Sequence, residues 1–338
     1  MFYFHMYAFV YLASNTVYRV SRTSMMTLGE NVEWIEVIFY QGNRHFTYYS
    51  LQLNMVNPRK YIQTDNLSHS TIQHLLEEFE EELVCMSGKG IDIGCGPGDV
   101  TRHTLLPALH PNAVVIGTDV SKDMIEYAKE LHADEERLKF EILDIQTKHL
   151  PEKHISEYDH VFSFHALHWC ADMRQVFENI YRLLRPDGTV LILMVISHDV
   201  FDILHKLSQD DRYTSYIKHA NNFIPEFHNS DHPHKDLKAL FKSVGFNVHH
   251  CSHRERTYSA NDAQELPEFL FSFITQFFED MPHDRIAELK DEFTQEYTKR
   301  RFFHKRGYNR NEKIASDLHE ILIVYAEKDN DVENIRKL

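Results

Sequence analysis

The chain has few cysteines, and their positions argue against a disulfide framework. Cys85, Cys95, Cys170 and Cys251 include no Cys-x-x-Cys pair, which fits a reducing compartment and predicts a cytoplasmic protein. Histidine is plentiful, with 24 residues, but the sequence contains no His-Glu-x-x-His motif and no His/Cys zinc spacing. We therefore predict no metal site.

Positive charge and long apolar runs are also scarce. The formal net charge is −15 with histidine neutral, so most of the surface would repel a phosphate backbone, and nucleic acid is not a predicted partner. Residues 1–13 are apolar, but the stretch is too short to span a bilayer and no basic residue precedes it. We predict no stable membrane insertion.

Glycine is rare as well, with 11 residues, yet Gly94, Gly96 and Gly98 alternate in one turn that follows a short apolar strand containing Asp92. A turn without side chains lets the backbone approach a ligand, with N–H groups and a helix N-terminus facing it. The spacing differs from the dinucleotide fingerprint G-x-G-x-x-G, which would place a glycine at Asp99. The turn predicts a nucleotide-type site that does not bind NAD.

Further strands are predicted at residues 113–119, 138–144, 158–164 and 189–196, separated by helices with one apolar face. The first two of these strands end in acids, Asp119 and Asp144. This alternation predicts a parallel sheet covered on both faces, with the ligand at the carboxyl ends of its strands. An acid at the end of the second strand can accept hydrogen bonds from a ribose diol.

This series resembles the class I S-adenosylmethionine-dependent methyltransferases. The matching segments are Ile91-Asp-Ile-Gly-Cys-Gly-Pro-Gly-Asp-Val-Thr101, Gly117-Thr-Asp-Val-Ser-Lys-Asp-Met-Ile-Glu-Tyr-Ala128 and Asp159-His-Val-Phe-Ser-Phe-His-Ala-Leu-His-Trp169. Their sequences are similar to those of the arthropod juvenile hormone acid O-methyltransferases, and the similarity covers about residues 55–328. The resemblance implies a doubly wound, Rossmann-like sheet of seven strands in the order 3-2-1-4-5-7-6, with the last strand antiparallel and helical insertions capping the acceptor pocket.

The resemblance also implies roles for individual residues. The cofactor, S-adenosylmethionine, would be bound by the glycine turn with Asp92 as its anchor, by Asp119 at the ribose, and by Asp144 with Ile145 at the adenine. Trp169 would line the acceptor pocket, beside His165 and His168, which would either act as bases or orient the acceptor. The complete set of expected site residues is Asp92, Gly94, Gly96, Gly98, Asp119, Asp144, Ile145, His165, His168 and Trp169.

The acceptor is expected to be an oxygen of a small molecule. The chain lacks the Asn/Asp-Pro-Pro-aromatic turn with which base and amide methyltransferases of similar fold hold an amino group. The resemblance implies the carboxylate of a small apolar, farnesoate-like acid, which is ionised at neutral pH and needs no strong base. A phenol or other small acceptor, and a non-catalytic cofactor-binding or partner-binding protein, remain alternatives.

One departure from the family concerns the segment 61–68, where the resemblance implies a lid over the cofactor and an ordinary connecting segment is the alternative. Ser68 stands where the family's lid has a glutamine that contacts the acceptor carboxylate.

The domain prediction is an extension over residues 1–54, a methyltransferase domain over 55–328 and a polar tail over 329–338. The extension could add a strand or helix to the domain, or the natural start could be Met55, where the family begins. Residues 200–223 are predicted to be an inserted helix and loop. A later helix carries an apolar stripe, at Leu266, Phe269, Phe273 and Phe277, that packs in the core or lines the acceptor chamber.

Overall fold

The computed structural model describes residues 23–27, 33–41, 44–50, 58, 66–217, 224–260, 265–274, 278, 281–300, 302–305 and 313–329. The chain folds as two compact units, Met1–Met55 and Val56–Leu338. In the first unit, β1 (Thr23–Thr27), β2 (Glu33–Gln41) and β3 (Arg44–Ser50) form an antiparallel sheet in that order. The apolar stretch 1–13 lies outside the described residues.

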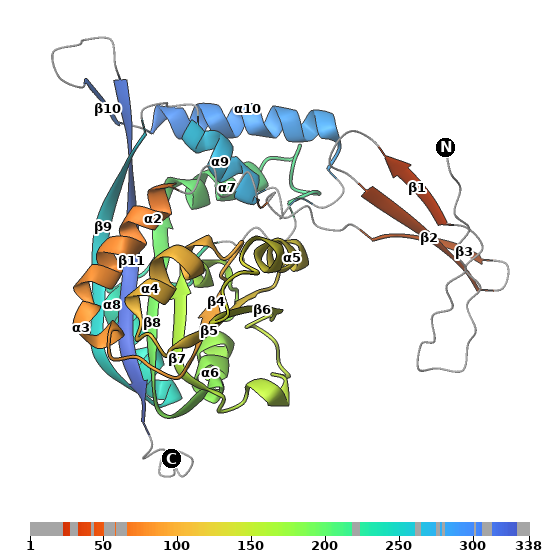
Figure 1. Ribbon diagram of the computed structural model, residues 1–338. Coiled ribbons are helices and arrows are strands. Elements are labelled where there is room, and N and C mark those ends of the chain that lie inside the picture. The colour runs from red at the N-terminus through yellow and green to blue at the C-terminus, as the bar shows by residue number, and fades with distance from the viewer. Residues whose placement is uncertain are drawn as a thin grey trace. The chain divides into compact units, whose positions relative to one another are not determined.

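The second unit is built on an eight-stranded sheet, in which β9 and β10 both pair with β11 (Figure 1). The path through the sheet is β10-β11-β8-β7-β4-β5-β6. Its strands are β4 (Lys89–Ile93), β5 (Val114–Asp119), β6 (Leu138–Ile142), β7 (Tyr158–Phe164), β8 (Leu184–His198), β9 (Phe246–Ala260), β10 (Phe302–Lys305) and β11 (Lys313–Lys328).

The strand order confirms the predicted topology. Read from β6 through β5, β4, β7, β8 and β11 to β9, the sheet has the order 3-2-1-4-5-7-6, with its last strand β11 antiparallel to β8. Strand β10, which pairs with residues 313–316 of β11, was not expected from the sequence. Strand β8 begins at Leu184, earlier than predicted, because the Leu-Arg-Pro-Asp-Gly segment already runs as part of the strand.

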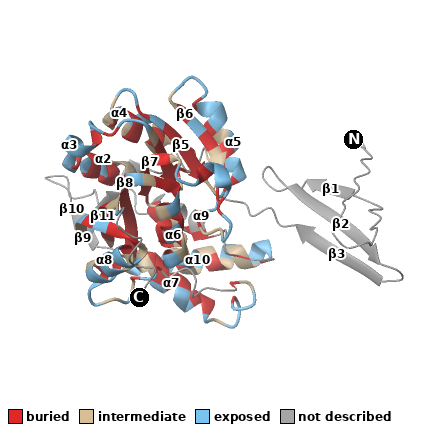
Figure 2. Ribbon diagram, turned by 90° about the horizontal axis from the view of Figure 1, so that it is seen from below, coloured by how far each residue is buried: buried red, intermediate tan, exposed pale blue. Residues whose placement is uncertain are grey.

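Helices cover both faces of the sheet. One hydrophobic cluster joins α2 (Asn66–Glu78), α3 (Glu80–Leu83), α4 (Leu106–Ala108) and α5 (Lys122–Leu131) to one face, and a second joins α6 (Met173–Leu183) and α8 (Pro233–Val244) to the other. The period of two along β7 explains the division, since Phe162 and Phe164 belong to the first cluster and Val161 to the second. In Figure 2 the strands of this sheet, β5, β7 and β8 among them, are largely in the colour of buried residues.

The helices of this unit are α2 (Asn66–Glu78), α3 (Glu80–Leu83), α4 (Leu106–Ala108), α5 (Lys122–Leu131), α6 (Met173–Leu183), α7 (Asp199–Ser208), α8 (Pro233–Val244), α9 (Glu265–Ile274) and α10 (His283–Lys299). A π-helical turn occurs at Thr101–Leu105 (η1), and short 3₁₀ helices occur at Glu152–His154 (η2) and Leu167–Trp169 (η3).

Local sequence signals fix where several helices begin and end. The side chain of Ser121 accepts a hydrogen bond from Met124 N at the start of α5, and Asp172 accepts one from Gln175 N at the start of α6. Helix α8 ends at Gly245, whose φ of 114° is a conformation that favours glycine.

Helices α7, α9 and α10 form a layer that extends the first hydrophobic cluster beyond the end of β8. Helix α7 starts one residue after that strand and fulfils the prediction of an inserted helix within residues 200–223. In α9, Leu266, Phe271 and Ile274 are buried. The side chains of Phe269, Phe273 and Phe277 lie outside the described residues, so the predicted stripe is described only at Leu266. Within the described part of the chain, no helix combines the length and apolarity needed to cross a bilayer.

The extension provides the first test. A polypeptide beginning at Met55 should fold and retain cofactor affinity, because the chain divides into compact units between Met55 and Val56 and every predicted cofactor residue lies downstream of that point. Thermal unfolding of the shortened and full-length chains should give midpoints within a few degrees of each other, which corresponds to less than about 1 kcal/mol. Aggregation of the shortened chain would instead show that residues 1–54 contribute to the core.

Candidate functional site

The predicted site residues lie at the carboxyl edge of the parallel strands. The glycine turn follows β4, Asp119 ends β5, Asp144 follows β6, and His165 follows β7. In a parallel doubly wound sheet these ends share one edge, which is where ligands bind. The sheet therefore gathers predicted residues that are far apart in the sequence.

Hydrogen bonds that the glycine turn donates to the neighbouring strand β5 hold it in place. Gly94 N and Cys95 N both donate to Thr118 O, at 2.7 and 2.9 Å, and Gly96 N donates to Asp119 Oδ2 at 3.0 Å. Asp119 Oδ1 accepts a hydrogen bond from Ser121 N at 2.8 Å. Each carboxylate oxygen has a second lone pair, so Asp119 can shape the turn and still accept a hydrogen bond from a ligand.

The glycines of the turn differ in what surrounds them, although all have positive φ values. A Cβ at Gly94 would overlap the side chain of Ala166, and one at Gly98 would lie 2.5 Å from the ring of Phe140. A Cβ at Gly96 would have no heavy atom within 4 Å, at a φ of 54°. Gly94 and Gly98 are thus required by packing, whereas Gly96 borders open space that a ligand can occupy.

The acids of this edge are held in an environment that disfavours negative charge. Asp92 is 2% exposed and accepts a hydrogen bond from Thr101 Oγ1 at 2.6 Å. Burial raises the pKa of Asp92 to about 7, although the bond from Thr101 opposes the shift. The pKa of Asp119 is also raised by burial, against the lowering effect of its backbone hydrogen bonds. A bound cation at this edge would favour the ionised form of both groups.

The loop after β6 is fixed by side chains that the sequence did not single out. Asp144 is exposed, and its Oδ1 accepts a hydrogen bond from Gln146 N at 2.9 Å. The buried Asn179 of α6 donates to Ile145 O at 2.8 Å and to Thr147 O at 2.7 Å. This leaves the Asp144 carboxylate in solvent beside a rigid backbone, as a polar contact for an adenine requires.

His165 and His168 carry buried nitrogens after β7. His165 has a φ of 53°, unusual for a residue other than glycine, and its backbone N donates to Leu193 O at 2.9 Å. Its Nε2 and the Nδ1 of His168 have no hydrogen-bond partner among the described residues. A buried polar atom without a partner is costly, so these atoms are candidates for contact with a ligand.

Burial keeps both imidazoles uncharged. It lowers the pKa of His165 to about 4. For His168, burial lowers the pKa well below the ordinary histidine value, and His165 and His198 add to the shift. At neutral pH these groups can donate or accept hydrogen bonds, but they are weak bases.

Trp169 lies in a cluster of rings. Its ring centroid is 4.8 Å from that of His168 and 5.8 Å from that of Phe201, in the first turn of α7. Because Ala166 touches the glycine turn, this cluster lies beside the predicted cofactor site. A further link comes from Ala171 N, which donates to Gln146 Oε1 at 2.7 Å. The structure thus brings together the two sets of residues that the sequence assigned to cofactor and acceptor.

The lid segment is described only at its end. Ser68 lies in the first turn of α2, but its side chain is outside the described residues. The next residue, His69, has its Nε2 3.7 Å from Oδ2 of Asp99, which directly follows the glycine turn. The start of α2 therefore adjoins the turn. The rest of the predicted lid, residues 61–65, is not described.

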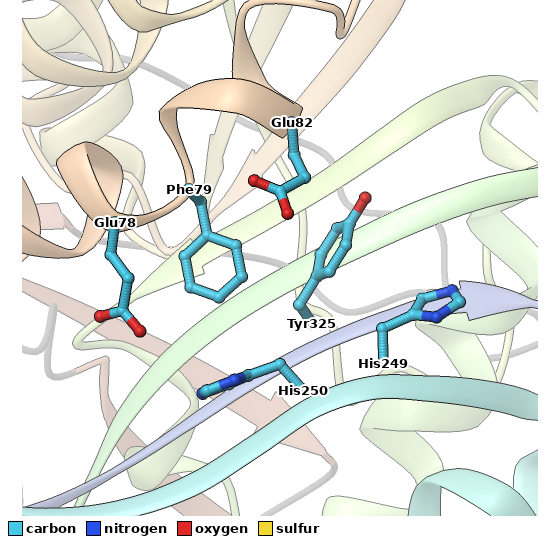
Figure 3. Close-up of a pocket in the computed structure, with 6 residues that line it drawn as sticks. All are labelled: Glu78, Phe79, Glu82, His249, His250 and Tyr325. Carbon is cyan, nitrogen blue, oxygen red and sulfur yellow. The ribbon is translucent and has the colours of Figure 1, made fainter.

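A hollow of about 570 Å³ lies away from this edge, between α2, α3, β9 and β11. Figure 3 shows Glu78, Phe79, Glu82, His249, His250 and Tyr325 around it. Several of its polar groups are already engaged, since Arg254 binds both oxygens of Glu78 and His249 contacts Glu327 at 3.0 Å. We assign no ligand to it. Among the described residues no group of three or more His, Cys, Asp or Glu is placed to hold a metal ion.

The chain is similar in sequence to known methyltransferases. Residues 91–190 match the family model described as "Methyltransferase domain". The chain is 29% identical to the juvenile hormone acid O-methyltransferase of Drosophila melanogaster over 272 residues, covering 79% of this chain and 91% of that protein. It is 27% identical to the juvenile hormone acid O-methyltransferase of Bombyx mori over 277 residues, covering 81% and 98%. Among solved structures, the YcgJ protein from Bacillus subtilis gives a TM-score of 0.47 at 17% identity and covers 76% of this chain and 99% of that one.

The glycine turn supplies a matched pair of substitutions. Gly96→Ala should cost about 1–2 kcal/mol of stability from its left-handed backbone and also weaken cofactor binding, because the new methyl group enters the open space. Gly94→Ala has the same backbone cost plus the overlap with Ala166, so its loss of stability should be larger. Chemical denaturation and calorimetric titration with S-adenosylhomocysteine measure the two effects. Full affinity in a folded Gly96→Ala variant would place the ligand elsewhere.

Proposed function

We propose that the chain, a methyltransferase with the class I fold, transfers the methyl group of S-adenosylmethionine to the carboxylate of a small apolar acid. The observation that carries the proposal is the contact between Gly94 and Ala166, which places the open glycine turn beside the buried imidazoles of His165 and His168. The relatives named juvenile hormone acid O-methyltransferase support an acid as the acceptor and favour a farnesoate-like one.

The residues present fit this cofactor. Gly96 leaves room at the turn, Asp119 retains acceptor capacity for ribose hydroxyls, and Asp144 offers an exposed carboxylate for the adenine amino group. Asp92, through Thr101, holds the start of the turn in place. Ile145, which is 6% exposed, would give the adenine an apolar contact.

When bound, S-adenosylmethionine supplies a methyl group that its sulfonium already activates. The protein must therefore align the acceptor with that methyl group and exclude water. As the methyl group is transferred, the negative charge of the carboxylate and the positive charge of the sulfonium both disappear. A site of low polarity therefore favours the neutral products over the charged reactants.

Uncharged histidines suit this chemistry better than charged ones. An imidazolium beside the carboxylate would stabilise the ionised ground state and lower its nucleophilicity, whereas a neutral imidazole N–H can orient the carboxylate by a hydrogen bond. Burial holds His165 and His168 in the neutral form. We assign them the orientation of the acceptor carboxylate, with Trp169 as an apolar wall of the pocket.

The neutral state of these buried histidines also disfavours the alternative acceptor, a phenol. A phenol has a pKa near 10 and needs a base to become a nucleophile at neutral pH. A histidine with a pKa of about 4, such as His165, is a poor base for that purpose. The net charge of −15 also disfavours nucleic acid. We propose a cytoplasmic location on the cysteine usage, since the cysteines of the described chain are free thiols.

The pH profile separates these acceptors. With an acid substrate and saturating cofactor, kcat/KM should be flat from about pH 6 to 9, because the acceptor is ionised, His165 is neutral throughout and the bound cation favours ionised Asp92. It should fall below about pH 5 as the acid and then His165 take up protons. For a phenol, kcat/KM should instead rise about tenfold per pH unit over the neutral range.

Stability imposes a lower limit on that measurement. The folded pKa of His165, about 4, lies below the ordinary value of 6.5, so the unfolded chain binds more protons between these values. His165 thus contributes stability that is present above pH 6.5 and lost as the pH falls through about 4. Unfolding midpoints at each pH distinguish a chemical effect from loss of folded protein. A profile that rises through pH 7 with an acid would contradict the absence of a catalytic base.

Ser68 tests how the carboxylate is held. A serine hydroxyl is shorter than a glutamine amide by about two bonds, so it cannot reach the same carboxylate oxygen from the same backbone position. Ser68→Gln should raise kcat/KM for farnesoate by about ten- to a hundredfold if it adds a hydrogen bond to a charged group in the transition state. Cofactor affinity should not change. If the natural protein already turns over farnesoate rapidly and Ser68→Gln gives no gain, His165 and His168 alone hold the carboxylate.

A further inference from the structure

A buried polar network lies behind the acceptor side of the site. Asp317 on β11 is 0% exposed, and its Oδ2 is 2.9 Å from Nε2 of His198, the last residue of β8. The same oxygen accepts the hydroxyl hydrogen of Tyr297 on α10, a residue 1% exposed. The network therefore joins two strands of the sheet to a helix of the covering layer.

The hydrogen bonds fix the protonation of His198. Its Nδ1 accepts a hydrogen bond from Val200 N at 2.9 Å, so that nitrogen carries no proton. The imidazole hydrogen must then be on Nε2, where it is donated to Asp317. The ring of Tyr297 stacks against that of His198 at an interplanar angle of 12°. The side chain of His198 thus caps the start of α7, and the buried carboxylate of Asp317 fixes the orientation of its ring.

The first turn of α7 carries Phe201, the ring that links this network to the acceptor pocket. Its centroid is 6.4 Å from that of His198, 6.3 Å from that of His168 and 5.8 Å from that of Trp169. Phe201 is 3% exposed. Its position depends on where α7 begins, and the cap supplied by His198 fixes that position.

We propose that Asp317, His198 and Tyr297 are positioning residues for the acceptor, because they set the start of α7 and hold Phe201 against Trp169 as the wall on which the apolar part of the acid packs. The inference rests on the proposed function for its choice of substrate. The network does not touch the acceptor itself. Its loss should weaken recognition of the apolar chain and leave the cofactor site intact.

The kinetic test compares a long and a short acid. Asp317→Asn and His198→Leu should raise KM for farnesoate by about ten- to a hundredfold, since the first removes the charge that strengthens two buried hydrogen bonds and the second breaks the bond to Asp317. KM for acetate, whose single methyl group gives it almost no apolar chain to pack on Phe201, and the Kd for S-adenosylhomocysteine should change by less than about threefold. Phe201→Ala should reproduce the same selectivity, and combining it with Asp317→Asn should add little.

Two further variants keep the test informative if those substitutions unfold the chain. Tyr297→Phe removes one donor to Asp317 and should give a smaller effect of the same selectivity. His198→Asn retains a side chain that caps helices well, so it should recover most of the KM lost in His198→Leu. The matched control is Arg300→Gln, since Arg300 joins α7 at Asp199 (3.1 Å) and Asp202 (3.5 Å) but is partly exposed. It should change KM by less than about threefold.

A fluorescence measurement makes the result independent of turnover. The chain has 2 tryptophans, so a Trp34→Phe background leaves Trp169 as its single indole. Emission of Trp169 should shift to longer wavelength in Tyr297→Phe and His198→Leu, and return towards the natural value in His198→Asn. If the chain esterifies no acid but these shifts occur, the proposed function fails and the positioning role stands. Unchanged emission together with unchanged KM for farnesoate would overturn the positioning role.

Discussion

The close approach of the glycine turn to the segment after β7 is the constraint on which the site depends. A side chain at Gly94 would overlap Ala166, so these backbones can meet only where residue 94 is glycine. Because Ala166 stands between His165 and the ring cluster of His168 and Trp169, this contact sets the separation of the proposed cofactor and acceptor sites. Two hydrogen bonds to Thr118 O keep the turn in that position.

Much of the fold could be predicted from the sequence, because parallel strands and amphipathic helices leave regular patterns. The strand order with an antiparallel β11, the one-sided helices and the insert after β8 were all expected. Strand β10 was not, since residues 302–305 carry no alternating pattern and pair only because β11 extends past the end of β8. For residues 1–54 the sequence predicted at most one added strand or helix, and the three-stranded sheet of the first unit was not expected.

The candidate site was predictable to the extent that its residues belong to local motifs. Glycines and acids at strand ends can be recognised from the sequence. A supporting residue such as Asn179 cannot, because it lies in α6, far along the chain from the loop after β6 that it binds. The signal for His198 and Asp317 was present in the sequence as polar residues within or at the end of apolar strands. Their pairing could not be inferred, because it depends on the register of β11 against β8.

Burial has opposite consequences for the acids and the histidines of this site, and together they suit a reaction in which charges disappear. It raises the pKa values of Asp92 and Asp119, so these groups gain from a nearby cation, and it lowers those of His165 and His168, so these groups stay neutral beside an anion. The cofactor side thus favours a sulfonium, while the acceptor side offers hydrogen bonds without a counter-charge. Under the proposed function the product ester is neutral, so it retains little of the electrostatic attraction that held the carboxylate beside the sulfonium, and this loss favours its exchange for a new acid.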